Sequence, residues 1–182
     1  MAIIMMDNYP SVSVVRMKRE IGEWNLTRRW RALWRPMLKL VDILLVEDDA
    51  SDAELVLAAL RERQISTHVV HVVDGYEAMD FIFRSSLFVN WSELRVPRLL
   101  LLDLNLKSVS GLDVLRQLKA EDRTKTIPVV VFTGSQRDID LIESYRLGVN
   151  SYVMKPMDGK QFMQTVGDIG HYWMNVNHPP AH

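Results

Sequence analysis

The 182-residue chain contains no cysteine. This absence excludes disulfide bonds and thiolate metal sites, and it suits a reducing compartment such as the cytoplasm. Long apolar runs are also absent, since none approaches the ~20 residues that a membrane-spanning helix needs. The opening hydrophobic stretch lacks the basic segment and longer apolar core of a secretion signal. We therefore predict a cytoplasmic protein without a membrane span.

The chain carries little net charge, −1, but its two parts differ in sign. Residues 1–40 hold eight basic and three acidic side chains, a balance of +5, together with three of the five tryptophans. The remainder carries −6. This shift in composition predicts a basic N-terminal extension over 1–40, one domain over 41–175 and a tail over 176–182.

The basic extension has two interpretations. It is either an amphipathic helix that contacts a kinase, a membrane or a nucleic acid, or a segment without such a role, which is a disordered extension or the product of a start codon upstream of the true one at Met37. We favour the second interpretation.

From residue 41 onward, short apolar runs alternate with amphipathic segments. We predict strands over 42–46, 67–73, 99–102, 128–132 and 150–153, and helices over 52–63, 75–84, 111–121, 136–146 and 159–174. This alternation is typical of βαβ units around a parallel sheet. The runs at 99–102 and 128–132 are continuously apolar, as expected for strands that helices cover on both faces. The sequence thus predicts an α/β, doubly wound fold.

Each predicted helix is preceded by a short polar side chain with an acidic or amide residue three positions later. Such pairs cap the free N–H groups of a helix start. The five pairs are Ser51 and Glu54, Asp74 and Glu77, Ser110 and Asp113, Ser135 and Asp138, and Asp158 and Gln161.

Reactive side chains follow four of the predicted strands. Glu47, Asp48 and Asp49 follow the first strand and Asp103 follows the third, while Thr133 and Lys155 stand at the ends of the fourth and fifth. Open α/β sheets bind their ligands at the carboxyl ends of parallel strands. We therefore expect these groups to meet at one sheet edge.

Five sequence blocks occur in an order that resembles the receiver domain of two-component response regulators. They are ILLVEDD at 43–49, LLDLNL at 101–106, SGL at 110–112, FTG at 132–134 and YVMKP at 152–156. The resemblance spans about residues 42–165. It implies a flavodoxin-like receiver fold with five strands in the order 2-1-3-4-5. It also implies that a sensor histidine kinase transfers a phosphoryl group to Asp103.

The resemblance further implies a Mg²⁺ site. Asp48 would bind the metal directly, Glu47 would act mostly through water, and Asp103 and the main-chain carbonyl of Asn105 would complete the site. Oxygen ligands of this kind suit Mg²⁺ or Mn²⁺. Asp49 is either a further acid of this pocket or an adjacent loop acid, and we favour the loop.

Six positions take further roles from the resemblance. Thr133 would hydrogen-bond the phosphoryl group, and Lys155 would pair first with Asp103 and then with that group. Tyr152 would be the aromatic switch residue, although packing in the core explains a strand tyrosine almost as well. In the family the lysine–proline bond is cis, which implies a cis bond before Pro156. Asn105 and Ser135 occupy positions that tune dephosphorylation.

Two departures and the C-terminal sequence refine the assignment. Lys107 stands where many receivers have proline, and the segment 85–97 lengthens the connection before the third strand. This insertion, with Tyr172-Trp173 and the trailing Pro179-Pro180, resembles single-domain regulators of bacterial phytochrome kinases. An apolar stripe on the last helix predicts a homodimer, formed there or through the fourth helix, fifth strand and fifth helix.

Other functional classes fit less well. An enzyme with an aspartyl-phosphate intermediate usually has a second acid two residues after its nucleophile, where this chain has Asn105. A phosphorylation-independent interaction module with a receiver fold is the alternative to phosphoryl acceptance, but such modules tend to lose acids that are present here. A flavin carrier would need a phosphate loop after the first strand. Only eight residues follow the last predicted helix, so we expect no DNA-binding domain and no direct nucleic-acid binding.

Overall fold

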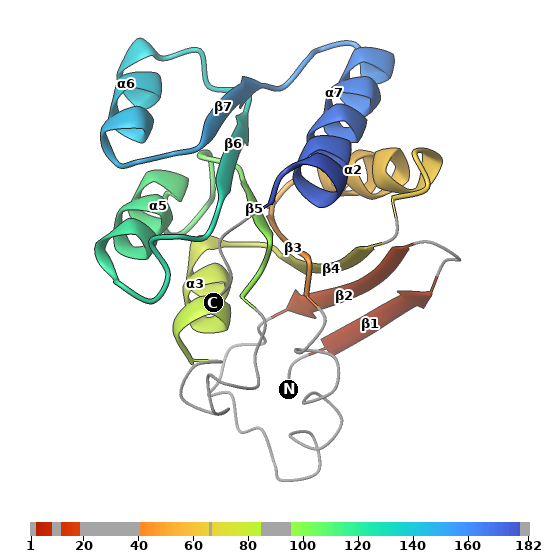
Figure 1. The fold of residues 1–182 in the computed structure, drawn as a ribbon, viewed down its shortest axis with the longest axis horizontal. Coiled ribbons are helices and arrows are strands. Elements are labelled where there is room, and N and C mark those ends of the chain that lie inside the picture. The colour runs from red at the N-terminus through yellow and green to blue at the C-terminus, as the bar shows by residue number, and fades with distance from the viewer. Residues whose placement is uncertain (1–2, 9–11, 19–40, 66, 85–95, 179–182) are drawn as a thin grey trace, which may run out of the picture.

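A twisted sheet forms the centre of the fold (Figure 1). The computed structural model describes residues 3–8, 12–18, 41–65, 67–84 and 96–178. Its strands are β1 (Ile3–Asn8), β2 (Val12–Lys18), β3 (Ile43–Val46), β4 (Thr67–Val72), β5 (Leu99–Leu102), β6 (Val129–Thr133) and β7 (Ser151–Met154). Their order is β1-β2-β4-β3-β5-β6-β7. Every neighbouring pair is parallel except β1 with β2. The five strands β4-β3-β5-β6-β7 confirm the predicted order 2-1-3-4-5.

Helices cover both faces of this sheet. They are α2 (Ala50–Glu62), α3 (Gly75–Met79), α5 (Gly111–Ala120), α6 (Asp138–Arg146) and α7 (Gly159–His171). Figure 1 shows α2 and α7 on one face and α3, α5 and α6 on the other. The strands β3, β5 and β6 are buried at every position, because each of them lies between two helical layers. Successive leucine and valine side chains of these strands point to opposite faces of the sheet and contribute to two separate hydrophobic clusters, one on each face.

The N-terminal residues differ from the predicted extension. β2 pairs in parallel with β4, and the side chains of Val12, Val14 and Val15 are buried. Arg16 makes an ion pair with Glu54 on α2. Residues 3–8 and 12–18 therefore extend the sheet by two strands, and the prediction of disorder was wrong for these residues. The β-branched run at Val12–Val15 was the signal, which averaging the charge over forty residues concealed. The tryptophans of this segment lie outside the described residues.

Three of the five predicted helix caps are confirmed. The side chains of Asp74, Ser110 and Asp158 each accept a hydrogen bond from a backbone N–H three residues later. The other two predictions were wrong. α2 is capped by Asp49, which accepts from the backbone N–H groups of Ser51 and Asp52. α6 begins later than predicted, after Arg137, and has no side-chain cap.

The C-terminal segment packs onto the domain. α7 continues as a π-helical turn over Tyr172–Val176, and the side chain of Met174 is buried within it. Arg98 donates a hydrogen bond of 2.7 Å to the backbone carbonyl of Met174, and the Thr67 hydroxyl lies 3.8 Å from its sulfur. This turn is therefore part of the folded domain. The long connection predicted at 85–97 falls mostly outside the described residues.

Candidate functional site

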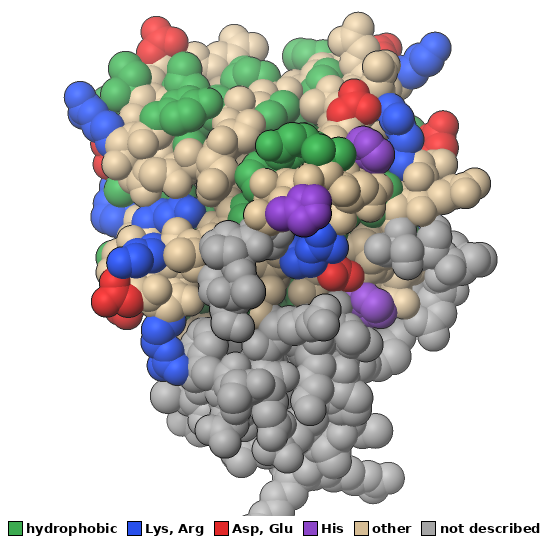
Figure 2. Space-filling view, in the orientation of Figure 1, with side chains coloured by type: hydrophobic (Ala, Val, Ile, Leu, Met, Phe, Trp, Pro, Cys, Tyr) green, Lys and Arg blue, Asp and Glu red, His purple; other side chains and the backbone are tan. Residues whose placement is uncertain are grey.

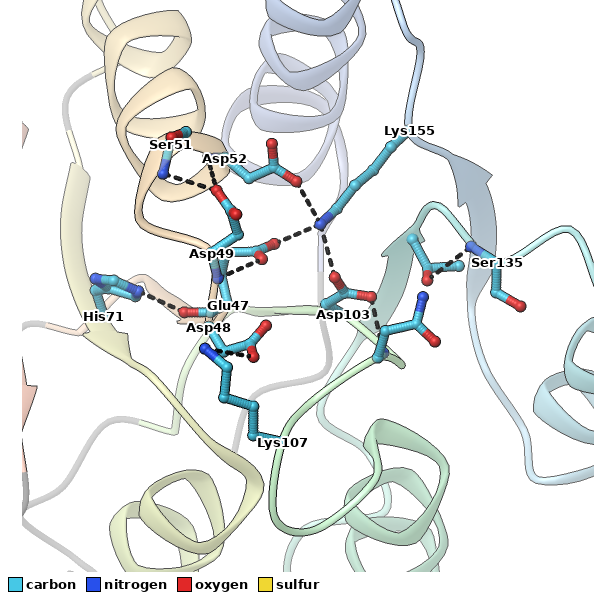
Figure 3. A network of polar contacts seen from close by, with 12 residues as sticks. Glu47, Asp48, Asp49, Ser51, Asp52, His71, Asp103, Lys107, Ser135 and Lys155 are labelled. Carbon is cyan, nitrogen blue, oxygen red and sulfur yellow. Dashed lines mark hydrogen bonds and ion pairs between the residues drawn. The ribbon is translucent and has the colours of Figure 1, made fainter.

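At the carboxyl edge of the sheet, the side chains of Glu47, Asp103 and Lys155 meet as predicted, and Asp48 lies beside them (Figure 3). β3 and β5 are in register, so Val46 is level with Leu102 and its carbonyl accepts a hydrogen bond from the Asp103 N–H at 3.0 Å. Glu47 and Asp103 therefore leave their strands side by side. The main-chain N–H of Lys155 bonds the Thr133 carbonyl at 2.8 Å and extends the β6–β7 pairing to the same edge.

The ammonium group of Lys155 is the centre of this site. Its Nζ lies 2.7 Å from Glu47 Oε2, 2.7 Å from Asp103 Oδ2 and 2.8 Å from Asp52 Oδ2. The pairing of Lys155 with Asp103 was predicted, but Asp52 was not. Asp52 stands in the first turn of α2, where its carboxylate faces Lys155.

Burial and charge oppose each other in this cluster. The Glu47 carboxyl is almost fully buried, and desolvation raises its pKa to about 7, although Lys155 partly offsets the rise. Burial by itself lowers the pKa of Lys155, but the Glu47 charge and the hydrogen bonds to Asp103 and Asp52 raise it overall. Lys155 is therefore a permanent cation that compensates an acidic pocket.

Three carboxylates are arranged to hold a cation. Oxygen atoms of Glu47, Asp48 and Asp103 all lie within 4.8 Å of one another. Glu47 and Asp103 are buried, and charges of one sign at such distances require a positive partner. An all-oxygen donor set of this size fits a divalent ion of the Mg²⁺ or Mn²⁺ class. On the other side, Lys107 Nζ lies 3.3 Å from Asp48 Oδ2.

The backbone after β5 fixes the Asp103 carboxylate. The Asn105 N–H donates to Asp103 Oδ1 at 3.0 Å, which leaves Oδ2 for Lys155. Gly111 begins α5 against this segment, and its N–H bonds the Leu104 carbonyl at 3.1 Å. A Cβ on Gly111 would lie 2.1 Å from the Asp103 carbonyl oxygen, so only glycine fits this close approach.

Ser135 connects three elements near the site. Its N–H donates to the hydroxyl of buried Thr133 at 3.2 Å, and its own hydroxyl donates to buried Asp140 on α6 at 2.5 Å. Its carbonyl accepts from the Tyr152 hydroxyl at 3.2 Å. The Tyr152 ring also packs against the core, which was the alternative explanation for a tyrosine at this position. The expected helix-capping role of Ser135 is replaced by this bond to Asp140.

The predicted cis bond before Pro156 was wrong, since the described residues contain no cis peptide bond. The Lys155 N–H is held in the β6–β7 pairing, and the ammonium group reaches the pocket along its extended side chain. A trans bond is therefore compatible with the Lys155 contacts.

His71, on β4, is a buried neighbour of the site. Its Nε2 lies 2.9 Å from the Glu47 carbonyl and must donate the proton, because a carbonyl only accepts. Burial lowers the pKa of His71, which favours the neutral ring. A histidine on the strand next to β3 supports the Glu47 backbone in this way.

Within the described part of the chain, none of the helices is both long and apolar enough to cross a membrane.

Comparison with known proteins gives a consistent result. The sequence model of the response regulator receiver domain matches residues 43–167. Response regulator Rcp1 of Synechocystis is 37% identical over 139 residues, which cover 76% of this chain and 92% of Rcp1. The phosphorylated cyanobacterial phytochrome response regulator RcpA superposes with a TM-score of 0.70 at 36% identity, covering 78% of this chain and 99% of RcpA. The bacteriophytochrome response regulator RtBRR is 45% identical, with a TM-score of 0.59 and coverage of 78% and 84%.

The family match spans more than half of the chain, and the strand order and the arrangement of acids and lysine agree with it. This chain therefore belongs to the response regulator receiver family.

Proposed function

We propose that Asp103 accepts a phosphoryl group from the phosphohistidine of a sensor histidine kinase. The observation that carries the proposal is the Asp103 carboxylate, held between the Asn105 N–H and the Lys155 ammonium at the open edge of the sheet. A carboxylate oxygen attacks the phosphorus atom, so that an O–P bond forms while the N–P bond breaks. The histidine nitrogen leaves with the electron pair and takes a proton from water.

The Glu47, Asp48 and Asp103 carboxylates, with the Asn105 carbonyl, would hold Mg²⁺ as cofactor. When bound, such an ion neutralises phosphoryl oxygens. Two observations support a divalent ion of the Mg²⁺ or Mn²⁺ class. The donor atoms of the three carboxylates are all oxygen, and the relative Rcp1 has a crystal structure in an Mn²⁺-bound form. Lys155 lies beside Asp103 Oδ2, where it can donate to a phosphoryl oxygen. Direct binding by Asp48, with Glu47 acting through water, stays a prediction.

Thr133 and Tyr152 are proposed as the switch residues. The Thr133 hydroxyl stands at the end of β6, and Ser135 links it to Tyr152 through two hydrogen bonds. A phosphoryl group on Asp103 that attracts the Thr133 hydroxyl would disturb both of these bonds. We propose that this shift, rather than turnover of a substrate, is the output of the protein.

The relatives suggest the partner. RcpA and RtBRR are described as regulators of a cyanobacterial phytochrome and a bacteriophytochrome, and we propose a phytochrome-like kinase as donor. The alternative, a phosphorylation-independent interaction module, is disfavoured because the acids, Thr133 and Lys155 are all present. Absence of direct nucleic-acid binding and a cytoplasmic location stay predictions.

Incubating the full chain with acetyl phosphate and Mg²⁺ tests the proposed function. We expect intact-mass measurement to show one added phosphoryl group, and peptide mapping after borohydride reduction to place it on Asp103. Omitting Mg²⁺ or adding EDTA should suppress the adduct. A chain that stays unmodified with both small phosphodonors and phosphorylated kinases would support the interaction module.

Replacing Lys107 with methionine should strengthen divalent-metal binding. Lys107 is 80% exposed and pairs with Asp48, so it competes with an incoming cation only through a weak surface ion pair. We expect the Kd for Mn²⁺, followed by the electron paramagnetic resonance signal of free Mn²⁺, to fall about two- to fivefold at low salt. Lys125→Met removes an exposed lysine that pairs with Asp122, and it should leave the Kd unchanged. Equal effects of the two changes would contradict a specific role of Lys107.

We also propose a homodimer. Exposed apolar side chains lie on the C-terminal turn, at Tyr172 and Val176. A second group lies on α6, at the end of β7 and in the connection to α7, the part of the molecule where Figure 2 shows hydrophobic side chains at the surface; it comprises Ile139, Leu141, Ile142, Tyr145, Met154 and Met157. Such patches are typical of partner surfaces. The apolar stripe predicted on the last helix (Phe162, Val166, Ile169, Tyr172, Trp173 and Val176) is exposed only in part, because Trp173 and the residues before Tyr172 pack in or on the core.

Charged substitutions separate the two surfaces. Light scattering should show a dimer for the full chain. If the C-terminal turn forms the dimer, Tyr172→Glu with Val176→Glu should give a monomer and Ile142→Glu with Tyr145→Glu should leave a dimer. If the second group forms the dimer, the two outcomes are reversed. Each variant should unfold at the same temperature as the wild-type chain. These changes are preferable to deletion of residues 171–182, which would remove the buried Met174. A monomeric full chain, with and without beryllofluoride, would refute the dimer.

A further inference from the structure

Asp52 differs from the other carboxylates around Lys155. Its Oδ2 lies 2.8 Å from the Lys155 ammonium, and in Figure 3 it approaches from α2, on the opposite side from Asp103. The oxygens of Glu47 and Asp103 belong to the group that can surround one metal ion, whereas Asp52 is not a member of that group. Asp52 is thus a ligand of the lysine alone.

The hydrogen-bond count shows what metal binding changes. A lysine ammonium has three N–H donors, and here Glu47, Asp52 and Asp103 accept one each. A divalent ion held by Glu47 and Asp103, directly or through water, would compete with Lys155 for these carboxylates and repel its ammonium group. Asp52 is then the remaining carboxylate partner among the described residues. A lysine on a flexible four-carbon side chain needs such a partner to stay in place.

We propose that Asp52 is a positioning residue that holds the Lys155 ammonium beside Asp103 once the metal has bound. This inference rests on the proposed phosphoryl acceptance by Asp103. Asp52 would not compete with the phosphoryl group, because a metal held by Glu47 and Asp103 would weaken the other two hydrogen bonds of Lys155. One N–H donor would stay on Asp52, and the donors released from the other carboxylates could bind phosphoryl oxygens. The first turn of α2 is itself fixed by the Asp49 cap, so the anchor is rigid.

The effect of removing the Asp52 carboxylate should depend on whether Mg²⁺ is bound. Without Mg²⁺, Glu47 and Asp103 hold Lys155 whether or not Asp52 is present. With Mg²⁺, Lys155 should stay ordered in the wild-type chain and become mobile in Asp52→Asn. A residue that merely stabilised the fold would change both states alike.

The experiment follows the Lys155 ammonium by ¹⁵N NMR of lysine-labelled full-length protein, with Lys155→Arg used to assign the signal. Each variant is measured without Mg²⁺ and at saturating Mg²⁺, judged from backbone amide shifts. We expect a slowly exchanging ammonium signal in every case except Asp52→Asn with Mg²⁺. Asp52→Glu should restore that signal, and Glu62→Gln, an exposed change on the same helix, should resemble wild type. A Lys155 signal that persists in Asp52→Asn with Mg²⁺ overturns the proposal.

A second measurement links the anchor to chemistry. The rate of phosphorylation by acetyl phosphate at saturating Mg²⁺ should fall about tenfold in Asp52→Asn, the loss expected for one charge-assisted hydrogen bond, and recover in Asp52→Glu. An unchanged rate overturns this positioning role. Failure of the proposed function would look different, since the wild-type chain would then form no adduct while the NMR comparison remained readable.

Discussion

Asp103→Asn will form no phosphoryl adduct under conditions that modify the wild-type chain completely. An amide oxygen is a far weaker nucleophile than a carboxylate, and the other acids of the pocket are held away from an incoming phosphorus atom. Glu47 is buried and bonded to Lys155, while Asp49 is bonded to the start of α2. We therefore expect a complete loss of the adduct, measured by intact mass.

The asparagine variant should keep its fold. Its side chain has the same shape, and its carbonyl oxygen can still accept from the Asn105 N–H. Asp122→Asn is the matched control, because Asp122 is an exposed acid that pairs with Lys125. This control should be phosphorylated at the wild-type rate. An adduct that persists in Asp103→Asn would assign the phosphorylated residue elsewhere.

Lys155→Met should produce the largest loss of stability among the single changes considered. Lys155 is 11% exposed and touches two nearly buried carboxylates. Removal of one partner from a buried ion pair typically costs about 3 kcal/mol or more, because the remaining charge is left uncompensated. We expect a loss of about 3 kcal/mol in the free energy of unfolding at pH 8, measured with urea and without metal.

The cost should depend on pH in a defined direction. The pKa of Glu47 is raised from 4.5 to about 7 in the folded chain, so the folded state binds this proton more tightly than the unfolded state. The stabilisation from that proton is complete below about pH 4.5 and is lost as the pH rises through 7. Without Lys155 the rise in pKa is larger, so Lys155→Met should lose less stability at pH 5.5 than at pH 8.

Two comparisons test this explanation. Lys125→Met, which removes an exposed ion pair, should change stability by less than about 1 kcal/mol at either pH. Saturating Mg²⁺ should recover part of the loss in Lys155→Met, because a divalent ion compensates the same carboxylates. A loss that is equal at both pH values would show that packing of the lysine side chain, and not its charge, is responsible.

Much of the fold followed from pattern alone. The predicted strand at 99–102 agrees with β5 at both ends, because a run of four leucines between polar residues permits one placement in a doubly wound sheet. The position of Asp103 directly after that run placed it at the sheet edge. Once the strands are parallel, the meeting of Glu47, Thr133 and Lys155 near it follows from topology.

What could not be predicted depends on three-dimensional contacts. Asp52 belongs to an amphipathic helix, and only the orientation of α2 relative to the end of β7 shows that its side chain faces Lys155. His71 is one polar residue in an apolar strand, and its partner is a main-chain carbonyl that carries no sequence signal. Ser135 stands at a position typical of a helix cap. Its hydroxyl instead donates a hydrogen bond to the side chain of Asp140, which lies two residues after the start of α6.

The three hydrogen bonds of Ser135 have a mechanical consequence. One residue joins Thr133, Tyr152 and Asp140, and thereby ties together the ends of β6, β7 and α6. Thr133 and Asp140 are buried, so neither side chain has free volume in which a displacement could be absorbed. We therefore expect a displacement of the Thr133 hydroxyl to shift the start of α6 as well, because the hydrogen bonds of Ser135 join the two. The stiffness of this connection would set how far a change at the site extends to the protein surface.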